Sequence, residues 1–209
     1  MALKNYKVEE NTHIGWERKL YDFIVNQKPA DADKEFTIQL PDAVVLNIRY
    51  LYSSPDAASI EISHKRTNAK GFYTMILIKI NDVYYYQSPW SKPNQKFHYI
   101  VELVAHKTKN KLPKDTMIKY NGWVQMLFDF IANQKSADNE FTIQLAYTVT
   151  LNIRYLYSSP DATSIEVSYK FCNQLSTRIL IKINDVYYDA YPNEISWLPS
   201  HEIFAAIYP

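Results

Sequence analysis

The residues best suited to bind a ligand occur twice along the chain, in the same order. Residues 81–85, Asn-Asp-Val-Tyr-Tyr, recur as residues 184–188, and a tryptophan follows each copy. Aromatic rings and short polar side chains together suit the flat faces and hydroxyl groups of sugars. The sequence therefore predicts two ligand sites, formed by Asn81, Asp82, Tyr84, Tyr85 and Trp90 and by Asn184, Asp185, Tyr187, Tyr188 and Trp197.

Acidic residues that recur between the copies could serve acid–base chemistry. A glycosidase needs two carboxylates on either side of the bond it cleaves, at a separation that a sequence does not reveal. For Glu61 the simpler prediction is a cross-strand ion pair with Arg49 or Lys79. Asp56 and Asp82 follow Pro55 and Asn81, which is typical of turns. Hydrolysis by carboxylates is therefore a lesser alternative.

Other catalytic signatures are missing from the sequence. Its three glycines leave no phosphate loop or dinucleotide fingerprint, and no HExxH or paired-cysteine zinc spacing occurs. His64 is replaced by Tyr169 in the second copy, so a site used by both copies cannot depend on it. The single cysteine, Cys172, excludes an internal disulfide and is expected to be a packed thiol. We expect neither a metal nor a cofactor.

Composition and charge indicate an ordinary globular protein. Hydrophobic residues make up 47% of the chain and charged residues 22%, and the net charge is +1. A charge this close to balance exerts no long-range attraction on nucleic acid, so no nucleic-acid partner is expected. No stretch reaches the roughly 20 apolar residues of a membrane helix, and the first residues lack an apolar signal sequence. We expect a cytoplasmic protein, or a secreted one whose signal has been removed.

A long internal repeat organises the chain. Residues 46–57 recur unchanged as residues 151–162, an offset of 105 (151 − 46). The offset is 107 for the upstream Gly-Trp pair at residue 15 and 103 for the block that begins at Ile78. Each change marks a two-residue deletion, within residues 30–34 and 65–74, which we interpret as surface loops. This period is far longer than a solenoid repeat, so each copy is the size of a domain.

The boundary between the copies is a basic, proline-containing segment. Residues 107–115 read as a linker, which predicts a first module of residues 1–106 and a second of residues 116–209. Two arrangements remain open, namely separate domains and modules that share one core. The oligomeric state is open as well.

Each copy should contain one helix followed by strands. Trp16, Leu20, Phe23 and Ile24 have the spacing of one helical face. Residues 35–40, 44–53, 59–63, 74–80 and 83–85 alternate in polarity or are rich in β-branched and aromatic residues, which predicts strands. The closing segments, 97–104 and 202–207, fit either a strand or a helix.

The second copy helps to assign the faces of the longest strand. Val44, Leu46, Ile48, Tyr50 and Tyr52 form one series, and Val45 in the other series becomes Thr150 in the second copy. A hydroxyl in place of a methyl indicates that the face of Val45 is not dry core. The series containing Ile48 should therefore face the core.

The predicted fold is mostly β with minor α: two tandem copies of a small antiparallel β-sandwich-like module, each a sheet plus one N-terminal helix. A duplicated module presents two similar sites and gains avidity from them. The sequence therefore favours a non-enzymatic, bivalent, carbohydrate-binding protein. The main alternative is a protein-interaction or toxin-like β-protein, since tyrosine-rich surfaces suit protein partners equally well.

Overall fold

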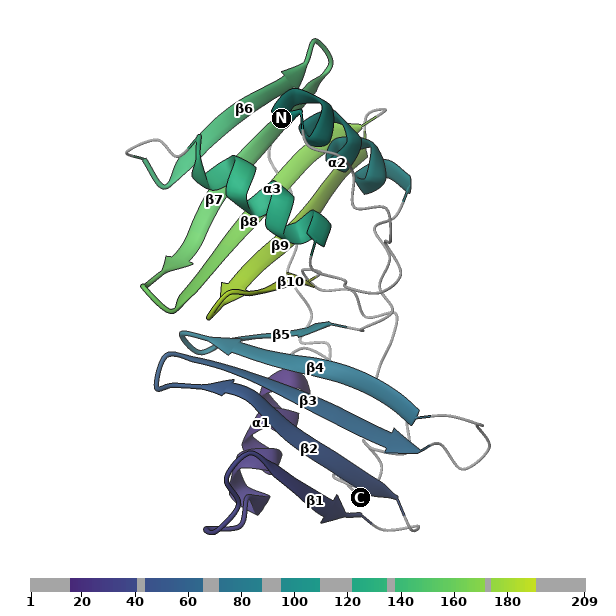
Figure 1. Ribbon diagram of the computed structural model, residues 1–209, viewed down its shortest axis with the longest axis vertical. Coiled ribbons are helices and arrows are strands. Elements are labelled where there is room, and N and C mark those ends of the chain that lie inside the picture. The colour runs from purple at the N-terminus through teal and green to yellow at the C-terminus, as the bar shows by residue number, and fades with distance from the viewer. Residues whose placement is uncertain are drawn as a thin grey trace, which may run out of the picture.

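The computed structural model describes residues 16–40, 44–65, 72–87, 95–109, 122–134, 138–171 and 174–190. The described residues form two five-stranded antiparallel sheets, and each sheet follows a helix in the chain (Figure 1). The first module contains α1 (Trp16–Gln27), β1 (Glu35–Gln39), β2 (Val45–Ser53), β3 (Ala57–Lys65), β4 (Phe72–Ile80) and β5 (Val83–Gln87). Then come α2 (Gln95–Thr108), α3 (Gly122–Ala132), β6 (Glu140–Ala146), β7 (Val149–Ser158), β8 (Ala162–Phe171), β9 (Gln174–Ile183) and β10 (Val186–Ala190).

Both sheets are simple meanders in which consecutive strands pair. This arrangement confirms the predicted fold class of a mostly β chain with two modules of sheet and helix. In the described residues no helix is long and apolar enough to cross a membrane. The predicted loop at residues 30–34 forms turns and bends between α1 and β1, whereas residues 66–71 lie outside the described residues.

Helix α1 packs on one face of the first sheet through the predicted apolar series. Trp16, Leu20 and Ile24 are buried, and the Trp16 ring lies 5.0 Å from the ring of Tyr86 on β5. Helix α3 repeats this packing on the second sheet with Trp123, Leu127 and Ile131. The helix-covered face of each sheet therefore holds the core of its own module.

The alternation of β2 is confirmed over most of its length. Leu46, Ile48 and Tyr50 are buried in the first core, whereas Val45 is exposed. The prediction is wrong for Tyr52, because a β-bulge shifts the register between Tyr50 and Tyr52. The extra residue of a bulge reverses the side-chain alternation that follows it. Tyr52 therefore packs on the opposite face of the sheet, as its counterpart Tyr157 does.

Ile48→Ala is expected to destabilise the protein by about 2–5 kcal/mol, the range for truncation of a buried aliphatic side chain. Ile48 is 2% exposed at the centre of the first core. Its neighbour Arg49 has a side chain that is 49% exposed, so Arg49→Ala should cost less than about 1 kcal/mol. Urea unfolding of both variants measures the difference, and a larger loss from Arg49→Ala would contradict the assignment of the two faces.

The two modules pack against each other through the sheet faces that carry no helix. A cluster of buried side chains from both modules joins them: Ala57, Ile78, Ile80, Ala162, Ile179, Ile181, Ile183, Tyr188 and Ala190. In Figure 1, α1 lies behind the first sheet and α2 and α3 lie in front of the second, with β5 and β10 adjacent between them. Each module thus has its own core, and a third apolar cluster links the two.

Two reciprocal tyrosine–serine contacts cross this shared cluster. The hydroxyl of Tyr188 donates to Oγ of Ser59 at 3.2 Å. Tyr85, the counterpart of Tyr188, interacts through its hydroxyl with Ser164, the counterpart of Ser59. Burial raises the pKa of both tyrosines. Because each contact repeats with the modules exchanged, a pseudo-twofold axis relates the two halves.

Helix α2 belongs to the first repeat in sequence and to the second module in space. Ile100, Val101 and Val104 are buried in the core that α3 forms with the second sheet. The ambiguous segment 97–104 is therefore helical, whereas residues 202–207 lie outside the described residues. The module boundaries at 106 and 116 remain a prediction.

Candidate functional site

The repeated Asn-Asp pairs form the tight turns between β4 and β5 and between β9 and β10. Ile80 pairs with Val83, which leaves Asn81 and Asp82 as the two turn residues. Their φ angles are 44° and 63°, and Asn184 and Asp185 have the same values. A two-residue hairpin of type I′ needs a positive φ at both positions, which Asn and Asp tolerate better than most residues. Turn geometry thus accounts for this part of the repeated motif.

The first tyrosine of each motif packs toward the helix of its own module. Tyr84 meets the ring of Tyr21 edge-on at 5.3 Å, and Tyr187 meets Phe128 edge-on at 5.5 Å. The second tyrosine, Tyr85 or Tyr188, lies in the shared cluster on the other face. The two rings of each motif therefore lie on opposite faces of the sheet, and all four rings take part in packing.

The carboxylates of Asp82 and Asp185 remain open to solvent, with side chains 83% and 88% exposed. The predicted members Trp90 and Trp197 lie outside the described residues. Because the tyrosine rings are packed, the aspartates and asparagines are the members of the motif that remain for a ligand. Ligand binding at the Asn-Asp-Val-Tyr-Tyr motif stays a prediction.

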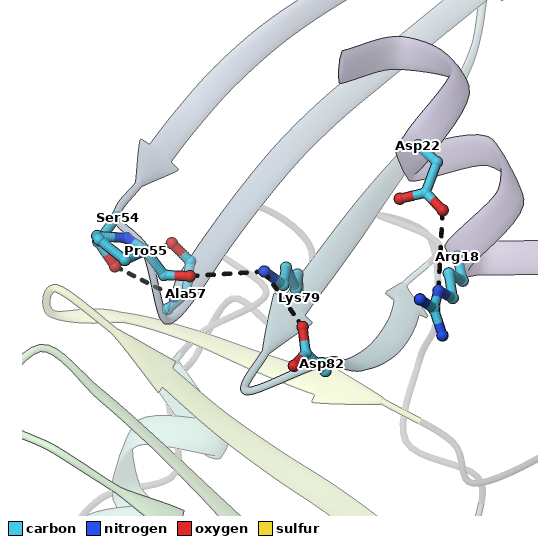
Figure 2. A network of polar contacts seen from close by, with 7 residues as sticks. All are labelled: Arg18, Asp22, Ser54, Pro55, Ala57, Lys79 and Asp82. Atoms are coloured by element: carbon cyan, nitrogen blue, oxygen red, sulfur yellow. Dashed lines mark hydrogen bonds and ion pairs between the residues drawn. The ribbon is translucent and has the colours of Figure 1, made fainter. Parts of the chain in front are cut away.

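A lysine from the preceding strand contacts the aspartate of each turn. Figure 2 shows Lys79 between the carbonyl oxygen of Pro55 and the carboxylate of Asp82, with both distances 3.5 Å. In the second module the corresponding pair, Lys182 and Asp185, is 3.0 Å apart, and its hydrogen bond raises the pKa of Lys182. Each turn aspartate thus already has a cationic partner.

The ring of Tyr21 gives this region a pH dependence. Burial, followed by the neighbouring charges of Tyr50, Tyr84 and Asp22, raises the pKa of Tyr21 to about 12. A tyrosine whose pKa is higher in the folded than in the unfolded state stabilises the protein fully below about pH 10, the ordinary value. That contribution is lost as the pH rises toward 12.

Tyr21→Phe should therefore lose less stability than the wild type between about pH 10 and pH 12. Urea midpoints measured across this range test the expectation. Tyr147→Phe is the matched control, because Tyr147 is fully exposed. An alkaline loss of stability as steep in Tyr21→Phe as in the wild type would contradict the assignment.

A second candidate site lies on the helix-free face of each sheet, over β1, β2 and β3 in the first module and over β6, β7 and β8 in the second. We call it the outer-face depression. In the first module it has a volume of about 480 Å³ and is lined by Glu35, Phe36, Thr37, Asn47, Ile48, Arg49, Glu61 and Ser63. In the second it has a volume of about 440 Å³ and is lined by Glu140, Phe141, Thr142, Asn152, Ile153, Arg154, Glu166 and Ser168. The eight residue types are the same in both modules.

Strand register arranges the polar residues of the depression in two rows. Glu35, Arg49 and Glu61 face one another across β1, β2 and β3. Thr37, Asn47 and Ser63 form the parallel row two residues away. From the strand spacing, each row spans roughly 10 Å and the rows stand about 7 Å apart. The depression therefore offers charged groups along one side and hydroxyl and amide groups along the other.

Ion pairs hold the charged row in place. Arg49 lies 2.8 Å from Glu61, and Arg154 lies 2.9 Å from Glu166, which confirms the predicted cross-strand pair. The hydrogen bond to Glu166 and then the charges of Glu166 and Glu140 raise the pKa of Arg154. A guanidinium has five N–H groups, so each arginine keeps N–H groups for a ligand beside its ion pair.

A larger cavity of about 690 Å³ lies beside α2 and α3 and has Lys107, Gln125, Asp129 and Asn133 among its lining residues. The Nζ atom of Lys107 donates to the carbonyl oxygen of Gln144 at 2.6 Å. The described residues contain no group of three histidine, cysteine or acidic side chains that could hold a metal ion.

No family model, curated protein or solved structure matches this chain. The function of this chain must therefore be inferred from the geometry of its own side chains. Most residues of the outer-face depressions were not among the predicted site residues. The signal that could have found them is the exact recurrence of polar residues on the strand face opposite Ile48, at an offset of 105.

Proposed function

We propose that this chain is a non-enzymatic, bivalent binding protein whose two outer-face depressions each bind a glycan. The observation that carries the proposal is the pair of depressions with the same eight residue types in the same two rows. Amide, hydroxyl, guanidinium and carboxylate groups within one shallow area match the alternating donors and acceptors of a polyhydroxylated ligand.

Exposed positions elsewhere are not uniformly the same in the two modules. Arg18 on α1 corresponds to Gln125 on α3, although Asp22 and Asp129 are the same. Even core positions differ, since Met75 corresponds to Arg178. Exposed substitutions usually change stability by less than about 0.5 kcal/mol, so stability alone does not require the same polar set on two open surfaces.

The placement of the depressions favours cross-linking of separate ligands. In Figure 1 the first sheet turns its helix-free face to the viewer, whereas the second sheet turns its helix-covered face. Strands β1 and β6, which border the two depressions, lie at opposite ends of the molecule. Two such sites can bridge two glycans or two cell surfaces and gain avidity.

The test begins with a glycan array probed with the labelled full chain, followed by calorimetry on the best ligand. We expect two equivalent sites per chain. Asn47→Ala should remove one site and abolish haemagglutination while leaving monovalent affinity at the other. Asn47→Ala combined with Asn152→Ala should abolish binding. Val45→Ala, an exposed change on the same face of β2, is the matched control and should leave binding unchanged.

A second pair of variants separates the depression from the turn motif. Asp82→Ala combined with Asp185→Ala should retain glycan binding if the depression is the site. Loss of binding in this pair, with retention in the asparagine pair, would move the site to the turns. A full chain that binds nothing on a broad array would contradict glycan binding and favour a protein partner instead.

Hydrolysis is the second candidate, because each depression contains two carboxylates. Glu35 and Glu61 flank Arg49 in the same row, two strands apart. Incubation of the array ligand with the full chain and assay for new reducing ends tests this alternative. Release of reducing ends that is lost in Glu35→Gln would replace the binding proposal by an enzymatic one.

A further inference from the structure

Strand β1 lies at one edge of the first sheet, as β6 does in the second. No strand among the described residues pairs with the outer edge of β1. An edge strand presents main-chain N–H and C=O groups that can pair with another strand. Figure 1 shows β1 and β6 at opposite ends of the molecule, away from the interface between the modules. The two edges are therefore the places where a strand from another molecule can be added.

The hydrogen bonds between β1 and β2 determine which residues face the open edge. The carbonyl oxygen of Lys34 accepts from the N–H of Tyr50, and the N–H of Leu40 donates to the carbonyl oxygen of Val44. Along an antiparallel pair, residues that bond to the neighbouring strand alternate with residues that do not. Counted from either end of β1, the residues whose main-chain groups point outward are Glu35, Thr37 and Gln39.

The corresponding edge of β6 is partly blocked. The carbonyl oxygen of Asn139 accepts from Tyr155, and the same alternation places the carbonyl oxygen of Gln144 on the outer edge. The Nζ atom of Lys107 on α2 donates to that oxygen, and the register shifts between Gln144 and Ala146. Lysine side chains and bulges are features that hinder pairing at sheet edges. Strand β1 keeps its register, and no side chain of the described residues donates to its outward carbonyl oxygens.

The sequence of β1 is complementary to itself in one antiparallel register, centred on Thr37. In this register Thr37 faces Thr37 of a second copy, Glu35 faces Gln39, and Phe36 faces Ile38. Polar residues meet polar residues on one face, apolar residues meet apolar residues on the other, and no like charges are opposed. The same register pairs all three outward-pointing residues, so each pair can exchange both of its main-chain hydrogen bonds.

We propose that two copies of this chain dimerise by antiparallel pairing of their β1 strands about a twofold axis at Thr37. The two first sheets then become one continuous sheet, and main-chain hydrogen bonds supply the attraction. Because both copies use the same strand, the contact closes on itself and gives a dimer, not a filament. The pairing uses main-chain groups and does not depend on glycan binding.

The pairing also joins the outer-face depressions of the two first modules. Thr37 is one end of the row of hydroxyl and amide groups that Asn47 and Ser63 continue. With Thr37 opposite Thr37 of the second copy, the two rows run end to end across the axis. The dimer therefore presents these two depressions as one longer polar surface.

Sedimentation equilibrium of the full chain without any ligand tests the dimer. We expect the mass to rise with concentration from that of one chain to that of two. Thr37→Pro should stay monomeric where the wild type is dimeric, because proline has no N–H to donate across the axis. The N–H of Thr37 points away from β2, so the first sheet loses no hydrogen bond. Thr142→Pro, the same change on β6, is the matched control and should still dimerise.

Three results of this experiment would overturn the proposal. One is a wild type that stays monomeric over the whole concentration range. Another is a mass that grows beyond two chains, which would indicate pairing of β1 with β6 of the next molecule. The third is a folded Thr37→Pro variant that dimerises as well as the wild type.

Charge changes at Gln39 test the register and leave the main chain of β1 intact. Gln39→Lys places a cation opposite Glu35 of the second copy, whereas Gln39→Glu opposes like charges, and each contact occurs twice across the axis. We expect a dissociation constant at least about fivefold lower for Gln39→Lys than for Gln39→Glu. The same two changes at Gln144 on β6 are the control and should give equal constants. Equal constants for the two Gln39 variants, or the reverse order, would contradict this register and overturn the proposal.

Discussion

Asp189→Ala is expected to destabilise the protein by about 3–5 kcal/mol, the cost of removing one partner from a buried ion pair. Asp189 on β10 lies 2.9 Å from Arg178 on β9, and both side chains are 2% exposed. Without the carboxylate, the guanidinium stays buried and loses its counter-ion. Urea unfolding measures the loss, provided that the slope of the transition is unchanged.

The first module provides the control for this prediction. Met75 and Tyr86 occupy the positions that correspond to Arg178 and Asp189, at the offset of 103. Replacing a buried ion pair by well-packed residues is often neutral or stabilising. Arg178→Met combined with Asp189→Tyr should therefore recover most of the stability lost in Asp189→Ala. A double variant as unstable as the single one would show that the pair itself, not the uncompensated charge, governs stability.

Tyr188→Ala should cost about 3–5 kcal/mol, the range for truncation of a buried aromatic side chain. Tyr188 is 2% exposed in the cluster that joins the two modules, and its hydroxyl is bonded to Ser59. The variant loses packing on both sides of the interface at once. Thermal or urea unfolding of the full chain gives the magnitude.

Two further variants separate the contributions of the ring and the hydroxyl. Tyr188→Phe removes only the hydrogen bond and should cost about 1 kcal/mol. Tyr85→Ala, at the pseudo-symmetric position, should cost less than Tyr188→Ala because Tyr85 is only half-buried. Equal losses in Tyr188→Phe and Tyr188→Ala would show that the ring contributes little to the interface.

The cluster around Tyr188 also bears on the question of separate domains. Each module has its own core between helix and sheet, and the third cluster contains side chains of both. Both arrangements that the sequence left open are thus partly realised, since separate cores coexist with a shared interface. Tyr188, which the sequence predicts as a ligand residue, lies in the interface between the two modules.

Local patterns in the sequence determined the secondary structure and most side-chain faces. The series Trp16, Leu20 and Ile24 identified the buried face of α1, and the alternation around Ile48 identified the buried face of β2. The change of Val45 to Thr150 correctly excluded the other face from the first core. These features follow from the periods of helix and strand, which depend only on neighbouring residues.

Contacts between segments far apart in the chain required the tertiary structure. Strand period alone does not reveal a bulge, so Tyr52 was assigned to the wrong face. The alternation of Ile76, Ile78 and Ile80 shows that one face of β4 is apolar, but not that the second module covers it. For the same reason the sequence could not place α2 on the second sheet.

The outer-face depression is another feature that the local sequence pattern predicts only in part and that the tertiary structure completes. Glu35, Arg49 and Glu61 are far apart in sequence and none belongs to a recognisable motif, although the ion pair between the last two was predicted. They form one row because the register of three strands places them opposite one another. Register depends on the packing of the whole sheet face and on the hairpin turns, so only the folded chain could bring these residues together.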